Sequence, residues 1–411
     1  MNDMTLYWIW LQLRLGSGAN VDEGIAFFEN PKAVYDATHE QLVFSAAFTS
    51  GQIKKLADKN LSDAQKVITE CEDIGCGIVT PDSDKYPKAL MCMPNYPLVL
   101  YTLGDIECLK NKLAISIVGT RRASDSGLEI AGKLSASLCR AGAVVVSGGA
   151  LGIDSAAHLG ALSAGGSTVA VLGCGFNAKY HDGTDVIRDD IEENGALISE
   201  YHPSFAARAM NFPIRNRIIA ALGMGTVVIE AAQKSGSLIT ANISADYGRD
   251  VFAVPGNAAN LIQLGTIGLI RDGATPVFSS SDILNQYSVT YSDLIDWDKV
   301  ESDLLYQSHE EIDFSKIKYG VKKIVMPKDK KVDEKEIEDI PPATESCKNS
   351  IPDGLSPAER AVYEAIAEGN SDSDSIKEKT NLPMSDILVA LTTLEISGII
   401  KCPGGHIYKI N

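Results

Sequence analysis

The segment NFPIRNRIIAAL, residues 211–222, is the stretch on which the interpretation of the whole chain depends. Pro213 fits the first turn of a helix, where a backbone N–H has no intrahelical acceptor, so a helix is predicted to begin here. Residues 215–217, Arg-Asn-Arg, would then lie at the positive end of that helix, and Phe212 offers an aromatic face beside them. These features favour a phosphate-binding site. The alternative is an ordinary surface helix that begins with proline and carries arginines.

A second helix start follows shortly after the first. The apolar run 226–229 has the character of a buried parallel strand. After it, Ser235-Gly236-Ser237 opens another helix, and small hydroxyl and glycine residues let backbone N–H groups approach an anionic oxygen closely. An ordinary capped helix is again the alternative.

The surrounding region alternates strands and helices with regular spacing. Such alternation predicts an α/β fold with a Rossmann-like, doubly wound, mostly parallel sheet that has helices on both faces. Ligands of this architecture bind beyond the carboxyl ends of the strands. We expect strands at 114–118, 143–147, 168–172, 196–199, 226–229 and 251–254, and helices from Ser126, from Asp154, near Asp185, at Pro213 and from Ser237.

The loops that follow these strands are rich in small and polar residues. Gly119-Thr120-Arg121-Arg122 follows the first strand, and Ser147-Gly148-Gly149 opens the loop after the second. Glycine-bearing loops also follow the third strand, at 173–175. Because the carboxyl ends of parallel strands share one edge of a sheet, these loops predict a single anion-binding crevice.

The usual nucleotide-enzyme signatures are missing from this crevice. The sequence after the second strand is not Gly-x-Gly-x-x-Gly, no acidic residue follows the third strand, and there is no Walker lysine motif. Asp154, His158 and Glu230 could serve as catalytic groups, but Asp154 suits a helix N-cap and His158 a packed position in an Ala-rich helix. The eight cysteines form no Cys-x-x-Cys pair and no zinc-spaced cluster with histidine, so we expect neither a metal nor a cofactor.

Length and charge limit the class of protein. A chain of 411 residues predicts two or three domains, and its formal net charge of −17 argues against nucleic acid as a partner unless basic groups are concentrated locally. No apolar run approaches a membrane span and no signal-peptide pattern begins the chain, so we expect a cytoplasmic protein without a membrane partner.

The regions on either side of the strand–helix region differ from it in character. Residues 1–76 show the spacing of a small helical domain of the SAM or helix-hairpin-helix type, and 77–290 form the Rossmann-like domain. Residues 291–352 are charged and predict a linker, whereas 353–411 predict a winged helix. Because its third helix, 384–397, has no Lys or Arg, contact with a protein or a regulatory role is favoured over reading duplex DNA.

These motifs together resemble the DprA (Smf) family of bacterial DNA-processing proteins. The resemblance covers about 77–277 strongly and the flanking domains more loosely. The loops 176–186 and 257–268 depart from the family pattern and are expected to shape the crevice differently. The matching segments are IVGTR (117–121), SGGALGID (147–154), FPIRNRIIA (212–220), SGSLIT (235–240), GRDVFAVPG (248–256) and LIRDGA (269–274).

The resemblance implies a homodimer that binds single-stranded DNA, protects incoming DNA and loads RecA recombinase in natural transformation. It implies no catalysis. Carried over to matching positions, it places the single-stranded DNA site at Gly119, Thr120, Arg121, Arg122, Gly148, Gly149, Phe212, Arg215, Asn216, Arg217, Ser235, Gly236, Ser237 and Thr240.

Two other functions compete with this interpretation. One is a nucleotide-processing enzyme of the LOG or lysine-decarboxylase-like type, a nucleoside-monophosphate hydrolase. Its Gly-Gly-x-Gly-Thr-x-x-Glu loop resembles Gly223-Met224-Gly225-Thr226 with Glu230, although the second glycine is missing and the acid is shifted. The other is an adaptor in which the winged helix does the work.

Overall fold

The computed structural model describes most of the first 316 residues and parts of the C-terminal region. The chain divides into two compact units, Met1–Ile324 and Val325–Asn411. The described residues are 3–178, 185–302, 304–305, 312–316, 356–367, 373–380, 382–383, 387, 390–391, 393–394, 400–401 and 409–410.

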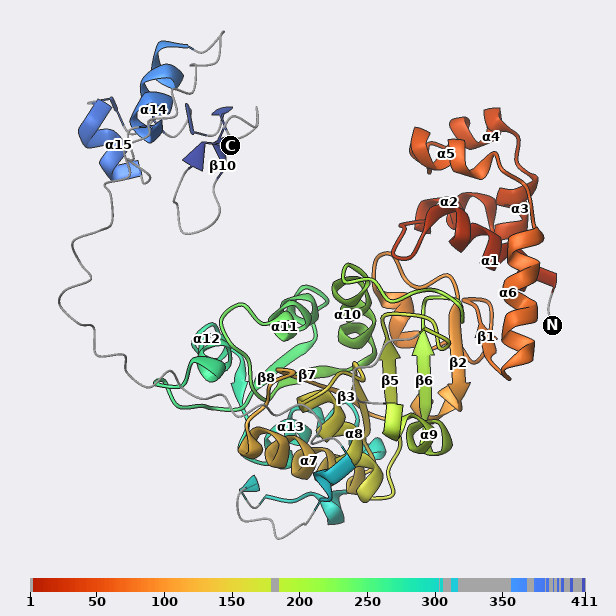
Figure 1. Cartoon of the computed structure of the whole chain (residues 1–411), viewed down its shortest axis with the longest axis vertical. Helices are drawn as coiled ribbons and strands as arrows, with labels where there is room; N and C mark the ends of the chain where they lie inside the picture. Colours follow the sequence, from red (N-terminus) through yellow and green to blue (C-terminus); the bar gives the residue numbers. More distant parts are fainter. Residues whose placement is uncertain are drawn as a thin grey trace, which may run out of the picture. The chain divides into compact units, whose positions relative to one another are not determined.

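The first unit is built on a nine-stranded sheet with the order β1-β2-β6-β5-β4-β3-β7-β8-β9 (Figure 1). Strands β3 to β9 that neighbour one another pair in parallel, while β2 pairs antiparallel with β6, and β1 with β2. The strands are β1 (Gly77–Val79), β2 (Leu100–Gly104), β3 (Ala114–Val118), β4 (Val144–Ser147), β5 (Thr168–Leu172), β6 (Ala196–Ser199), β7 (Gly225–Val228), β8 (Asp250–Ala253) and β9 (Thr275–Pro276).

The strand order confirms the predicted Rossmann-like, doubly wound, mostly parallel sheet. From β3 the chain first winds outward through β4, β5 and β6, and it then returns to β3 and continues through β7, β8 and β9. The direction of winding therefore reverses between β3 and β7. In such sheets a ligand crevice forms beyond the carboxyl ends of the strands at this point.

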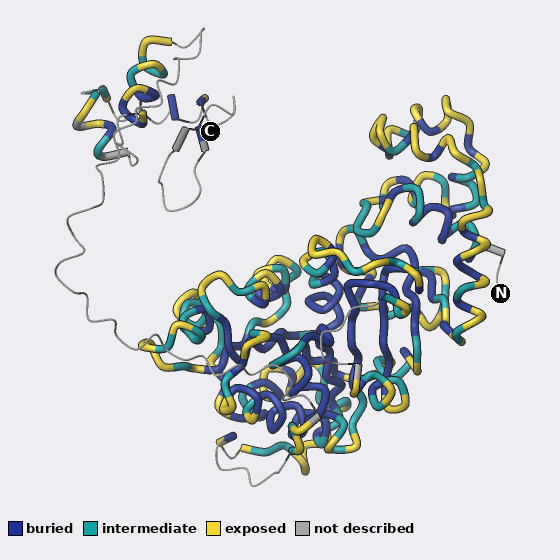
Figure 2. Tube along the Cα trace, viewed as in Figure 1, coloured by how far each residue is buried: buried dark blue, intermediate teal, exposed yellow. Residues whose placement is uncertain are grey.

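Alternate side chains of the central strands pack into two different hydrophobic cores, because successive side chains of a strand point to opposite faces of the sheet. One core takes Val118 and packs against α10 (Asn211–Leu222) and α11 (Gly236–Asp246). The other takes Ile117 and packs against α7 (Asp125–Arg140), α8 (Ile153–Ser163), α9 (Asp185–Asn194) and α13 (Ser280–Leu284). Figure 2 shows the strands buried between helices whose outer sides are exposed. One further helix of the sheet region, α12 (Leu264–Arg271), lies in the chain between β8 and β9.

Two predicted helix starts differ from the structure. Ser124, not Ser126, caps α7, because its Oγ accepts a hydrogen bond from the N–H of Gly127 at 3.0 Å. The N-cap of α8 is Gly152, so Asp154 lies inside the first turn instead of capping it. The side chain of Asp154 therefore does not cap α8, and its Oδ2 accepts from the N–H of Ala150, in the loop after β4, at 3.4 Å.

The N-terminal helices pack on the β1–β2 side of the sheet and share its first hydrophobic core, which takes Trp10 and Tyr101 alike. Gln12 Nε2 donates to the carbonyl of Val99 at 3.2 Å and to that of Glu200 at 3.0 Å, so buried hydrogen bonds also join them. The helices are α1 (Asp3–Leu15), α2 (Asp22–Phe28), α3 (Pro31–Asp36), α4 (His39–Phe44), α5 (Ser50–Leu56) and α6 (Ser62–Asp73).

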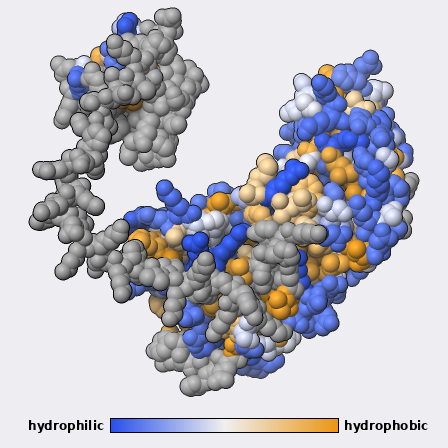
Figure 3. Space-filling view, viewed as in Figure 1, coloured by the Kyte–Doolittle hydropathy of each residue, from blue (hydrophilic) through white to orange (hydrophobic). Residues whose placement is uncertain are grey.

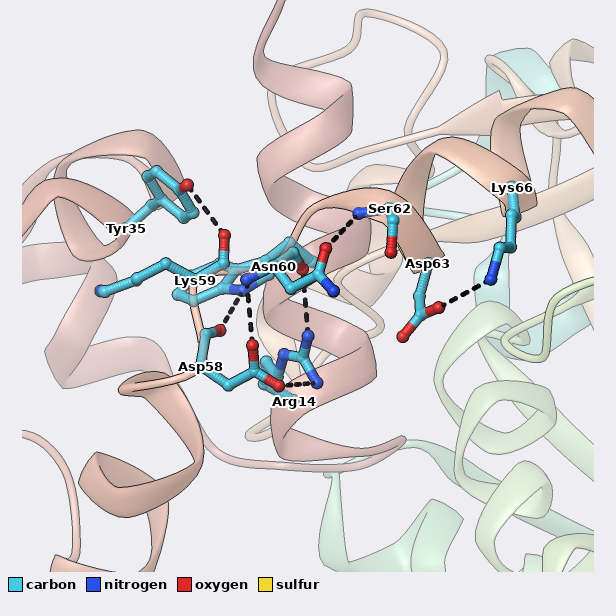
Figure 4. Close-up of polar contacts among 9 residues, drawn as sticks. Arg14, Tyr35, Asp58, Lys59, Asn60, Ser62, Asp63 and Lys66 are labelled. Carbon is cyan, nitrogen blue, oxygen red and sulfur yellow. Dashed lines mark hydrogen bonds and ion pairs between the residues drawn. The ribbon is translucent and has the colours of Figure 1, made fainter.

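The turn between α5 and α6 is fixed to α1 and α3 by polar contacts (Figure 4). Arg14 pairs with Asp58 at 2.9 Å and donates to the carbonyl of Asn60 at 3.0 Å. Tyr35 Oη donates to the carbonyl of Lys59 at 2.9 Å. Beyond the turn, α6 presents mainly hydrophilic residues on the face seen in Figure 3.

The linker predicted from residue 291 begins later than expected. Ile295 and Leu305 are buried against the core beside α7, and the N–H of Asp296 donates to the carbonyl of Ala141 at 2.9 Å. These two apolar residues hold the segment against the domain, although the residues around them are mostly charged or polar. The short 3-10 turns of the unit are η1 (Lys88–Cys92), η2 (Ile106–Leu109), η3 (Leu261–Gln263), η4 (Asn285–Tyr287), η5 (Ser292–Leu294), η6 (Trp297–Lys299) and η8 (Phe314–Lys316).

The second unit contains α14 (Pro357–Ala367), α15 (Ser373–Thr380) and a small sheet of β10 (Ile400–Lys401) and β11 (Lys409–Ile410). Ser356 and Glu359 form the expected reciprocal cap of α14, at 2.8 and 3.3 Å. The predicted third helix lies largely outside the described residues, and so does the turn at 403–405. Across the described part of the chain, no helix combines the length and apolar character needed to cross a bilayer.

Candidate functional site

A cavity of about 280 Å³ lies at the carboxyl end of β3, where the winding of the sheet reverses. It brings together ten of the fourteen residues predicted for the DNA site. They are Gly119, Thr120, Arg121, Phe212, Arg215, Asn216, Ser235, Gly236, Ser237 and Thr240. Val118, Ala150, Asp154, Pro213, Ile219 and Ile239 complete the lining.

Arg215 forms the inner wall of this cavity. Its side chain is buried, and Nη1 donates to the carbonyl of Gly148 at 2.6 Å and to that of Val171. A Cβ on Gly148 would lie 2.6 Å from Oδ2 of Asp154 and 3.0 Å from the guanidinium nitrogens of Arg215, so a larger residue here would displace one or both side chains. The ends of β4 and β5 therefore hold a fixed positive charge behind the cavity.

Phe212 lies close to two guanidinium groups at the start of α10. The Cζ of Arg121 lies 5.3 Å from the ring centroid and that of Arg215 lies 5.9 Å from it. Both distances are within the range of cation–π attraction. Phe212 is half-buried and Arg121 is exposed, so the aromatic face and one cation meet at the mouth of the cavity.

The opposite wall is the start of α11. Ser235 caps this helix, its Oγ accepting from the N–H of Ser237 at 3.4 Å. Asn216 Nδ2 donates to the carbonyl of Gly236 at 3.4 Å, which links the two helix starts. The first N–H groups of a helix carry a partial positive charge, so this wall favours an anion.

Asp154 is the acidic residue of the cavity lining, whereas the sequence favoured a capping role for it over a catalytic one. Its Oδ2 accepts a long hydrogen bond, 3.4 Å, from the N–H of Ala150. Burial raises the pKa of Asp154 to about 6, while the positive charge of Arg215 opposes the rise. The sequence did contain a clue to this role, because Asp154 directly follows the glycine-rich loop after β4 and that loop was expected to line the crevice.

His158, one turn further along α8, is fully buried. Its Nδ1 lies 2.8 Å from Oγ1 of Thr168, which itself donates to the carbonyl of Val145 at 2.8 Å. Burial lowers the pKa of His158 to about 3. The imidazole is thus a neutral packed group, as predicted, and it does not line the cavity.

Arg217 corrects an expectation about the α10 helix. Its side chain is buried and Nη2 pairs with Oε1 of Glu200 at 2.7 Å, away from the cavity. The same carboxylate oxygen accepts from the N–H of Gly18 at 3.2 Å. Arg217 therefore joins the N-terminal helices to α10 and is not placed to meet a phosphate.

The other predicted residues outside the lining have different positions. Arg122 is exposed and follows the lining residue Arg121, whereas Gly148 and Gly149 are buried behind the cavity. Within the divergent loop 176–186, residues 179–184 lie outside the described part of the chain.

Glu230 was the acid that suggested a nucleotide hydrolase. Both of its oxygens hold the start of α7, because Oε1 accepts from the hydroxyl of Ser124 at 2.5 Å and Oε2 from its N–H at 2.9 Å. Glu230 is buried and absent from the cavity lining. Glu230 therefore has a structural role, because it holds the start of α7 in place. Among the described residues, no cluster of three His, Cys, Asp or Glu is placed to hold a metal ion.

The family comparison agrees with this arrangement. The sequence model of DNA recombination-mediator protein A matches residues 77–288, which include every strand of the sheet and the whole cavity. The chain belongs to the DprA (Smf) family. A second model, for the DprA winged helix domain, matches residues 348–405.

Similarity to individual DprA and Smf proteins extends along most of the chain. Protein Smf of Synechocystis is 29% identical, and the match covers 99% of both chains. The DNA processing protein DprA of Bacillus subtilis is 35% identical over 58% of this chain and 82% of its own length. The crystal structure of DNA processing protein A from Streptococcus pneumoniae superimposes with a TM-score of 0.61 and 30% identity, covering 69% of this chain and 99% of that one.

Proposed function

We propose that this protein binds single-stranded DNA at the cavity beyond β3. The observation that carries the proposal is the position of Phe212, a half-buried lining residue whose ring lies within 6 Å of the guanidinium groups of both Arg121 and Arg215, at 5.3 and 5.9 Å. An aromatic face receives an unstacked base, and adjacent cations and helix-start N–H groups receive its phosphates. Membership of a DNA-processing family supports the same ligand.

Single strands are favoured over duplex by the size of the cavity. At about 280 Å³ it is slightly smaller than typical ligand pockets, which start at about 300 Å³. It can take one nucleotide whose base is turned out, but the bases of a duplex are stacked and paired and cannot reach Phe212. The contacts are to ring faces and phosphates, so sequence preference should be slight.

The test compares labelled oligonucleotides of one length, single-stranded and duplex, by fluorescence anisotropy over a salt series. We expect the single strand to bind more tightly, with an affinity that falls as salt rises. Equal affinity for the two forms would reject the proposal. Release of base or phosphate from added nucleotides at enzymatic rates would favour the hydrolase instead.

The wider role follows the family resemblance. We propose that the protein acts in the cytoplasm as a homodimer, protects incoming single strands and loads RecA recombinase without catalysing a reaction itself. The winged helix serves for contact with a protein partner. Gel filtration with light scattering tests the dimer, and RecA assembly on strands precoated with a single-strand binding protein tests loading.

A further inference from the structure

The loop between β6 and α10, residues 201–210, holds a second aromatic–arginine pair. Phe205 is half-buried, with the ring of Tyr201 at 4.9 Å and 32° and the ring of His202 at 5.4 Å and 89°. The guanidinium carbon of Arg208 lies 5.2 Å from the centroid of Phe205. These contacts hold the Phe205 ring in place, and Arg208 lies over the ring, so a base that stacks on Phe205 would take part of the space of this guanidinium group.

This pair lies next to the cavity, on the other side of the loop that follows β5. A Cβ added to Gly173 would lie 2.9 Å from the ring of Phe212, so that ring packs directly on Gly173. Two residues further on, the N–H of Gly175 donates to the carbonyl of Phe205 at 2.9 Å. Because two residues span at most about 7 Å, Phe212 and the Phe205 backbone lie on neighbouring parts of one rim.

The close approach explains why glycines occupy both positions of this loop. A Cβ on Gly175 would lie 2.2 Å from the carbonyl oxygens of His202 and Pro203, a distance that no side chain tolerates. The β5 loop therefore passes tightly under the 201–210 loop. The two aromatic residues are held on a shared backbone framework.

The local charge differs from that of the protein as a whole. Residues 201–229 contain three arginines and no Asp or Glu, in a chain with a formal net charge of −17, and one of the three, Arg217, pairs with the preceding Glu200. Arg208 is exposed, and no carboxylate among the described residues lies within ion-pair distance of it. The carbonyl of Arg208 accepts from the N–H of Asn211 at 3.0 Å, in a tight turn that leads directly into α10.

We propose that Phe205 and Arg208 form a second nucleotide position, at which a base of the same single strand stacks on Phe205 and its phosphate pairs with Arg208. The strand leaves the cavity at Phe212 and crosses the Gly173–Gly175 loop. This inference rests on the proposed single-stranded DNA function and adds the direction in which the strand runs along the rim.

The test uses the full-length chain, a labelled oligothymidylate of about sixteen nucleotides and a salt series. Phe205→Leu should weaken binding about 5- to 150-fold with an unchanged salt slope, since stacking contributes about 1–3 kcal/mol per base. Arg208→Ala should weaken binding and lower the slope by about 0.7, the value for one phosphate contact of a single strand. Thermal unfolding of each variant identifies any loss of fold.

Arg271→Ala is the matched control. Arg271 is an exposed arginine with a side-chain exposure of 82%, and an exposed Asp272 is its partner at 3.6 Å. It ends α12, which connects β8 to the edge strand β9, and β6 lies on the other side of β3 in the strand order. If Phe205→Leu and Arg208→Ala bind like Arg271→Ala while Arg121→Ala is impaired, the second position is rejected and the cavity proposal stands. If the wild type itself shows no preference for single strands, the proposed function fails first.

Photo-crosslinking gives a readout that needs no substitution in the protein. Wild-type protein is irradiated with a single strand carrying 5-iodouracil, and crosslinked peptides are identified by mass spectrometry. Stacked halogenated bases should crosslink to two separate peptides, one containing Phe212 and one containing Phe205. Crosslinks at Phe212 alone would overturn the second position.

Discussion

Arg217 and Glu200 form a buried ion pair, with Nη2 and Oε1 2.7 Å apart, that joins α10 to the end of β6. Their side-chain exposures are 6% and 2%. Gly18 donates its N–H to the same oxygen, so the α1–α2 loop is part of the contact. The pair therefore connects the N-terminal helices to the helix that carries the cavity.

Breaking this pair should destabilise the fold. Arg217→Met leaves the carboxylate of Glu200 buried without its cation, and we expect the free energy of unfolding to fall by about 3–5 kcal/mol in urea titrations. Replacing both partners, as Arg217→Met with Glu200→Leu, should restore most of that loss. A small effect of the single change, together with a flatter salt slope for DNA, would place Arg217 at the phosphates after all.

Arg121 and Arg122 offer a paired comparison, since they are adjacent and exposed but only Arg121 lines the cavity. Arg121→Ala should lower the salt slope of oligonucleotide binding by about 0.7. Arg122→Ala should change it much less. Equal effects of the two changes would indicate general charge attraction rather than a contact in the cavity.

Phe212 should act through stacking rather than charge. Phe212→Ala is expected to cost about 1–3 kcal/mol of oligonucleotide affinity with an almost unchanged salt slope. If Phe212 only fixes the start of α10, the variant will instead have a lower melting temperature and near-normal affinity. Anisotropy and thermal unfolding, measured on the same preparation, separate the two outcomes.

Asp154 should make DNA binding depend on pH. Burial raises the pKa of this carboxyl to about 6, so below that pH it loses the negative charge that offsets the arginines of the cavity. Affinity should therefore rise as pH falls from 7.5 to about 5. Asp154→Asn should bind more tightly than the wild type at pH 7.5 and show a flatter pH profile.

The raised pKa of Asp154 also makes the stability of the fold depend on pH. Between about pH 4 and about pH 6 the folded chain binds more protons at Asp154 than the unfolded chain, because its folded pKa is the higher one. The contribution of this residue to the free energy of unfolding therefore decreases as pH rises through that window. The free energies of unfolding of wild type and Asp154→Asn, measured by urea titration, should become equal at low pH, where Asp154 is protonated in both the folded and the unfolded chain. Parallel pH profiles would contradict the assignment.

Removing the second unit should leave single-strand binding intact. A chain that ends at Ile324 keeps every residue of the cavity, and the predicted third helix that it loses carries no Lys or Arg. We expect unchanged oligonucleotide affinity in anisotropy titrations. A truncated protein that melts normally but has lost most of its affinity would show that the winged helix contacts DNA.

The sequence alone was sufficient for six of the nine strands, β3 to β8, and for the edge of the sheet that carries the crevice. Apolar runs of four or five residues alternating with helical segments identify parallel strands, and a loop such as Gly119-Thr120-Arg121 can only lie at a carboxyl end once its strand is placed. Composition was a poorer guide. Residues 291–305 are charged, but Ile295 and Leu305 bury themselves against the core.

What each side chain faces was decided by tertiary packing. Arg215 and Arg217 are two residues apart on α10, and at 3.6 residues per turn their side chains point about 200° apart. One reaches the backbone carbonyls behind the cavity, and the other reaches Glu200 beneath the N-terminal helices. The sequence places both arginines at a helix start. Only the elements packed on either side of that helix determine which of them meets the cavity, because local spacing fixes the angle between two side chains but not the direction of the helix face.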